Sequence, residues 1–117
     1  MPSPRNRTLL LSPSDRAKAV PRLDGPAEAD RVYCADAIEG LRRSPPADLI
    51  FADPPYDGAA EWHARWIEAC AERLRPGGSI YVCCDWTFSG TIHALLARRF
   101  KVRNRITWGR EKGRGAK

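Results

Sequence analysis

Apolar residues recur in short blocks between residues 31 and 108, and their spacing changes from block to block. Two continuous apolar runs, 48–52 and 79–84, are typical of strands that are buried on both faces. Residues 31–34 form a short run of β-favouring residues, and residues 101–108 alternate between polar and apolar positions. The pattern therefore predicts about four strands.

The segments between these strands carry the helical period instead. Residues 36–44 begin with Asp36, a good N-cap, and residues 90–100 also repeat at helical spacing. The strongest helix is predicted over residues 61–74, whose apolar stripe consists of Trp62, Trp66, Ile67, Cys70 and Leu74. A breaker follows this helix, and in it Gly77 is available as a left-handed cap.

The resulting order, β-α-β-α-β-α-β, predicts an α/β fold with mostly parallel strands and flanking helices. Residues 1–30 hold five of the ten prolines and show no period, so we expect a disordered or loosely packed leader there. The folded domain is predicted over residues 31–117. In such sheets, ligands bind outside the carboxyl ends of the strands.

One such strand end carries an unusual turn, Asp53-Pro54-Pro55-Tyr56. Methylating the exocyclic amino group of a nucleobase requires acceptors aimed at its two N–H bonds, because its lone pair is delocalised into the ring. Asp53 offers a carboxylate oxygen and Pro54 a backbone carbonyl, while the two prolines keep the turn rigid. Tyr56 offers an aromatic face on which a base can stack.

A plain loop is the alternative interpretation of this turn. In that case Asp53 caps the following helix and Tyr56 packs against the domain, because Asp-Pro pairs are common in turns. The position of the turn, directly after an apolar strand in a β/α series, favours the functional interpretation.

Charge is concentrated at one end of the chain. The 117 residues carry a net charge of +6, and residues 98–117 contain nine Lys or Arg residues and one acid, Glu111. A basic end of this kind favours a polyanionic partner such as nucleic acid, and a solvated tail is the alternative. The candidate DNA-binding residues are Arg110, Lys112 and Arg114.

The four cysteines and two histidines show no zinc-binding spacing, so we expect no metal site and interpret the cysteines as small buried residues. No apolar run approaches the roughly 20 residues that span a bilayer. The run Leu9–Leu11 is too short for a signal peptide. These features predict a cytoplasmic protein with reduced thiols and no membrane partner.

Four segments, ADAIEGL, DLIFADPPYDG, LRPGGSIYV and RITWGREKGRG, resemble in this order the amino-terminal half of site-specific DNA adenine-N6 methyltransferases. The similarity is to the subgroup whose catalytic motif precedes its cofactor motif, and it covers about residues 31–117. It implies a Rossmann-like sheet, S-adenosyl-L-methionine as methyl donor, DNA as substrate and a restriction endonuclease as a partner in the same system. By this resemblance Asp53, Pro54, Pro55 and Tyr56 are the catalytic residues.

The sequence departs from that family in two places. Asp57 stands where the family often has asparagine, and the glycine-rich strand-turn that binds the donor is absent. No cofactor-binding residue is identified, although Asp53 is expected near the donor. We therefore interpret residues 31–117 as the catalytic half of a truncated methyltransferase domain, and we expect this chain alone to be inactive.

Two other functions stay open from the sequence. An rRNA guanine-N2 methyltransferase can carry a similar turn, but its donor motif lies upstream, where this chain has nothing suitable. A non-catalytic nucleic-acid-binding remnant would keep the half-fold and the basic end. Neither the recognition sequence nor the oligomeric state follows from these residues.

Overall fold

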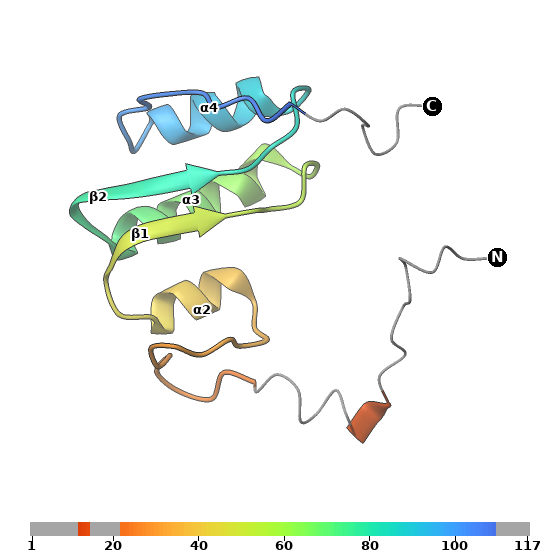
Figure 1. The fold of residues 1–117 in the computed structure, drawn as a ribbon, viewed down its shortest axis with the longest axis vertical. Coiled ribbons are helices and arrows are strands. Elements are labelled where there is room, and N and C mark those ends of the chain that lie inside the picture. Colours follow the sequence, from red (N-terminus) through yellow and green to blue (C-terminus); the bar gives the residue numbers. More distant parts are fainter. Residues whose placement is uncertain (1–11, 15–21, 110–117) are drawn as a thin grey trace.

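The structure is a computed structural model, and it describes residues 12–14 and 22–109. From residue 22 onwards, two strands alternate with three helices (Figure 1). In order, these are α2 (Ala37–Arg43), β1 (Ala47–Ala52), α3 (Ala60–Arg73), β2 (Leu74–Val82) and α4 (Ser89–Ala97). The strands β1 and β2 pair in parallel, so the predicted α/β class with parallel strands is confirmed.

The helices begin and end close to their predicted bounds because the sequence carries their signals. Asp36 caps α2, where its Oδ1 accepts a hydrogen bond of 3.0 Å from the Glu39 backbone N–H. The amphipathic stripe of α3 packs against α4, and the buried cluster consists of Trp66, Ile67, Cys70, Ile92 and Leu95. Residues of both strands, among them Ile50 and Ile80, pack on this cluster from one face of the sheet.

The glycine pair after α3 has a different role from the predicted one. The helix ends at Arg73, and Gly77 lies inside β2 with φ +81° rather than at the helix cap. A Cβ on Gly78 would lie 2.9 Å from the backbone oxygen of Asp48 on β1. The pair therefore permits the irregular register found between Ala47 and Leu49.

Two of the four predicted strands do not form within residues 22–109. Residues 31–34 contain only one end of an isolated bridge, between Arg22 and Cys34. Residues 101–108 follow α4 without pairing to either strand. The prediction of four strands was wrong for the described chain, because β-favouring residues form a strand only where a neighbouring strand accepts their hydrogen bonds.

The prediction that β1 and β2 are buried on both faces was also wrong. Leu49, Phe51 and Tyr81 point to the face opposite the helices and remain 58%, 67% and 48% exposed. Figure 1 shows the reason, because α3 lies behind the two strands and no described element lies in front of them. We call these three residues the open sheet face.

Part of the predicted leader contacts the domain. The Ala27 backbone N–H donates to the backbone oxygen of Arg43 at 3.0 Å, which joins residues 22–30 to the end of α2. The rest of the leader lies outside the described residues, apart from 12–14. No helix within the described part of the chain has the length and apolarity to cross a membrane.

Candidate functional site

The strands β1 and β2 end side by side. The Cys83 N–H donates to the backbone oxygen of Ala52 at 2.9 Å, directly beyond the paired residues Ala52 and Val82. Asp53 directly follows Ala52, the last residue of β1. The loops that follow the two strands lie at the same end of the sheet (Figure 1). The turn thus lies at the carboxyl edge, where α/β sheets bind their ligands.

The side chains of the turn are arranged around one hydrogen bond. The Tyr56 hydroxyl donates to Oδ1 of Asp53 at 2.7 Å, and both residues are exposed. Among the described residues, Oδ2 of Asp53 accepts no hydrogen bond. The first turn of α3 is capped by no side chain, so Asp53 is not the helix cap that the plain-loop interpretation requires.

The link between the turn and α3 is short and tightly held. Gly58 adopts φ +94°, a left-handed conformation that glycine adopts without strain. The backbone oxygen of Asp57 lies 2.6 Å from Nε2 of His63, a fully buried residue of α3. Sequence reasoning considered His63 only as a metal ligand and missed this contact. Its spacing from Trp66 and Ile67, three and four residues, already places it on the buried face.

The loop after β2 forms the other side of this edge. Oδ1 of Asp85 accepts hydrogen bonds from the Thr87 hydroxyl at 2.8 Å and from the Phe88 backbone N–H at 2.9 Å. This arrangement satisfies donors at the start of α4. Trp86 lies between them and is 87% exposed, which the sequence pattern did not indicate.

Two described cysteines, Cys84 directly after β2 and Cys70 in α3, have thiols that are poor nucleophiles. Burial raises the pKa of the Cys84 thiol, the charges of Asp85 and Cys83 add to that effect, and Arg105 opposes it. Burial also raises the pKa of Cys70 to about 11. Both thiols are therefore protonated near pH 7. In residues 12–14 and 22–109, no group of side chains could hold a metal ion.

One described residue of the basic end, residues 98–117, lies near the carboxyl edge of the sheet. The charge of Arg105 acts on Cys84, at the carboxyl end of β2. Figure 1 shows the chain after α4 running back towards the loop that follows β2. The three residues predicted to bind DNA, Arg110, Lys112 and Arg114, lie outside the described residues.

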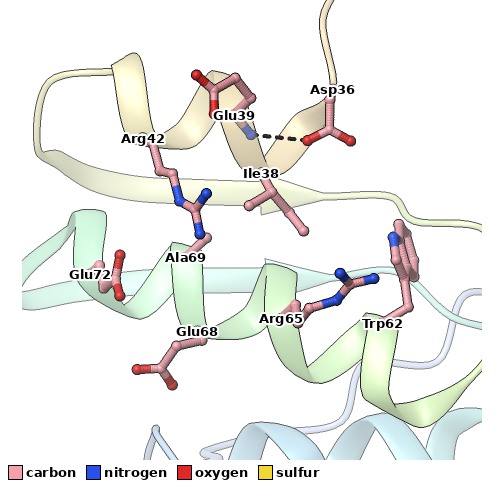
Figure 2. A pocket seen from close by; sticks show the side chains of 9 residues that line it. All are labelled: Asp36, Ile38, Glu39, Arg42, Trp62, Arg65, Glu68, Ala69 and Glu72. Carbon is pink, nitrogen blue, oxygen red and sulfur yellow. Dashed lines mark hydrogen bonds between the residues drawn. The ribbon is translucent and has the colours of Figure 1, made fainter.

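A cavity of about 390 Å³ lies elsewhere, between α2 and α3 (Figure 2). Its lining mixes charges of both signs, Arg42, Arg65, Glu68 and Glu72 among them. None of the turn residues Asp53–Tyr56 lines it. We therefore base the candidate site on the exposed carboxyl edge rather than on this cavity.

Comparison with known proteins found three curated methyltransferases. The chain is 28% identical over 95 residues to the type II methyltransferase M.BamHI of Bacillus amyloliquefaciens, covering 66% of this chain and 22% of that protein. It is 31% identical over 98 residues to the DNA adenine methyltransferase YhdJ of Escherichia coli K12, covering 69% and 33%. A third match, at 28% over 104 residues, is the type II methyltransferase M.HpaI of Haemophilus parainfluenzae, covering 73% and 33%.

The chain thus spans about a fifth to a third of the length of these relatives. No family model matches it, and no solved structure gives a significant match. None of the three relatives is named as an RNA methyltransferase, so the guanine-N2 alternative gains no support. The matches support the resemblance read from the motifs: over about two thirds of its length, this chain is similar to part of curated methyltransferases, one of which is named a DNA adenine methyltransferase.

Proposed function

We propose that this chain forms the base-binding part of an enzyme that methylates the N6 amino group of adenine in DNA. The observation that carries the proposal is the placement of the turn Asp53–Tyr56. It follows β1 at the carboxyl edge of the parallel pair, with its carboxylate and its aromatic ring both exposed. The similarity to DNA methyltransferases supports the same chemistry.

The acceptors of the turn would orient the amino group of an extruded adenine. Oδ2 of Asp53 would accept one N–H, and the backbone carbonyl of Pro54 would accept the other. Both contacts draw the nitrogen towards tetrahedral geometry and expose its lone pair on one side. The hydrogen bond from Tyr56 to Oδ1 holds the Asp53 carboxylate in one orientation, so that it needs little reorganisation when the base arrives.

The ring of Tyr56 would stack on the extruded base. Base–aromatic stacking tolerates any base, so this contact supplies affinity, and the acceptors supply the preference for an amino group. The two prolines limit the turn to a narrow range of backbone angles.

S-adenosyl-L-methionine is the methyl donor that this function requires, and it supplies an electrophilic methyl group on sulfur. The described residues do not fit it well. The loop after β1 contains one glycine, Gly58, and the loop after β2 contains none before α4. A Cβ on Gly58 would lie 3.7 Å from Nε2 of His63, so this glycine faces the protein. We therefore assign donor binding to none of residues 22–109.

Two partners complete the proposal. DNA would be held in part by Arg110, Lys112 and Arg114, whose charges suit phosphate contacts. Two of the relatives are named type II methyltransferases, so a restriction endonuclease of the same specificity is the protein with which this enzyme would act.

The decisive variant is Asp53→Ala, measured in a fusion of this chain to the segment of the E. coli relative that it does not match. Removing one preorganised polar contact to a transition state lowers kcat by about 10²–10³. The matched control is Asp57→Asn, which changes the acid that directly follows the turn. The kcat of this variant should stay within a few-fold of that of the parent fusion. Near-parental methyl transfer by Asp53→Ala would refute the assignment.

A further inference from the structure

One imidazole ring lies directly behind the turn and is not used by the proposed chemistry. His63 is 0% exposed, in the first turn of α3. Its Nε2 lies 2.6 Å from the backbone oxygen of Asp57, and its Nδ1 lies 3.0 Å from the indole Nε1 of Trp66. Both ring nitrogens therefore have a partner, as a buried polar group requires.

The identity of the partners determines the tautomer. An indole N–H can only donate, so Nδ1 of His63 must accept from Trp66. The proton of the neutral ring is therefore on Nε2, which donates to the Asp57 carbonyl. The imidazole thus joins a carbonyl of the turn to an indole of the α3 core.

The same ring also contacts the second loop of the edge. Its centroid lies 4.9 Å from that of Phe88, at the start of α4, and 4.7 Å from that of Trp62. Phe88 follows the turn that Asp85 holds by hydrogen bonds. His63 therefore contacts both chain segments that follow the paired strands.

We propose that His63 is a positioning residue, which fixes the turn Asp53–Tyr56 relative to α3 and to the loop after β2. Asp57 directly follows Tyr56, so the hydrogen bond from Nε2 restrains the stacking ring and the Asp53 carboxylate to which it is bonded. The catalytic meaning of this restraint depends on the proposed function, since misplacing a reacting group by about 1 Å can cost about 10²-fold in rate. The ring itself does not touch the base.

The first test needs no variant. Long-range ¹H–¹⁵N correlation spectra of the full 117-residue chain report which nitrogen of His63 carries the proton. We expect protonated Nε2 and an unprotonated Nδ1 that accepts from Trp66. A ring protonated on Nδ1 alone would overturn the proposal, because Nε2 could then not donate to Asp57.

The second test measures the backbone order of the turn and of the two residues that follow it. In ¹⁵N relaxation, a rigid backbone gives an order parameter of about 0.85 and a flexible one less than about 0.6. We expect His63→Leu, which fills the space without a donor, to move Tyr56, Asp57 and Gly58 from the first range towards the second. His63→Gln, which can still donate to the Asp57 carbonyl, should keep the turn ordered.

Two comparisons separate positioning from general destabilisation. Ile67→Val removes a buried methylene from α3 and should leave the order parameters of the turn unchanged. An equal loss of order throughout α3 in His63→Leu, or no loss in the turn, would overturn the proposal. If His63→Leu does not fold, the His63→Gln variant is the test. A disordered turn in His63→Gln would contradict the role of the hydrogen bond to the Asp57 carbonyl.

These measurements involve no methyl transfer, so they can refute the positioning role of His63 independently of the proposed function. A turn that loosens in His63→Leu, together with full activity of the Asp53→Ala fusion, would refute the catalytic role proposed for Asp53 and leave the positioning role of His63. A rigid turn in His63→Leu would refute the positioning role alone.

Discussion

Tyr56 contributes two separable groups to the candidate site, an aromatic ring and a hydroxyl. The hydroxyl donates to Asp53 at 2.7 Å, and the exposed ring is the surface on which a base would stack. We predict that Tyr56→Ala weakens binding of an extruded base by roughly 1–3 kcal/mol, the usual contribution of one base–aromatic stack. Tyr56→Phe should keep most of that affinity and lower kcat, because Asp53 loses its orienting donor.

Equilibrium binding of DNA that carries 2-aminopurine at the target position, read by fluorescence, separates the two groups. Equal loss of affinity in Tyr56→Phe and Tyr56→Ala would assign the contribution to the hydroxyl instead of the ring.

Single residues of the site differed in how far the sequence predicted them. The residues Asp53–Tyr56 were identifiable because four adjacent residues supply the acid, the carbonyl and the ring at a strand end. His63 and Trp86 were not identified, because their roles depend on which loops fold against them or leave them exposed. That information is in the tertiary packing and not in local residue spacing.

At the scale of one element, α3 connects the core to the turn. The thiol of Cys70 reports how deeply the inner face of α3 is buried. The pKa of this thiol is about 11 in the folded protein, above its ordinary value of 9.0, because burial disfavours the thiolate. Below pH 9 the thiol is protonated in the folded and in the unfolded protein, so the raised pKa takes nothing from the free energy of unfolding there. Between about pH 9 and 11 the unfolded state loses the proton first, and we predict that stability falls.

The measurement is the free energy of unfolding by urea at pH 8, 9, 10 and 11, compared with Cys70→Ala, which should show a smaller decrease over this range. A thiol reagent at pH 8 should modify exposed Cys34 well before Cys70. Rapid modification of Cys70 in the folded chain would contradict its burial.

The helices were predictable and half of the strands were not, for a physical reason. A helix satisfies its own backbone hydrogen bonds, so the apolar stripe of α3 and the Asp36 cap of α2 were enough to locate them. A strand depends on a neighbour. Residues 31–34 and 101–108 have the composition of strands and do not pair with either strand of the described sheet.

At the scale of the whole molecule, the helices described between residues 37 and 97 cover the parallel pair on one face, and no described element covers the other. The open sheet face, Leu49, Phe51 and Tyr81, leaves large apolar side chains in water, whereas parallel sheets are normally covered on both faces. We predict that the purified chain self-associates, because contiguous exposed apolar surface drives association.

The variant Leu49→Thr/Phe51→Ser should shift the chain towards monomer in sedimentation velocity over a range of concentrations. The control Trp86→Ser removes an exposed apolar side chain that is not part of the open sheet face, and it should leave the association unchanged. A parent chain that is monomeric at the highest concentration would contradict this prediction.

The central claim is that the turn Asp53–Tyr56 presents an adenine amino group for methylation, and the identity of the methylated nucleoside tests it most directly. The fusion described above is incubated with labelled S-adenosyl-L-methionine and DNA, and the DNA is digested to nucleosides for mass spectrometry. We predict that the label appears as N6-methyladenine, that Asp53→Ala removes most of it, and that the 117-residue chain alone transfers none. Label on the N4 amino group of cytosine, or on guanine, in place of adenine would contradict the account.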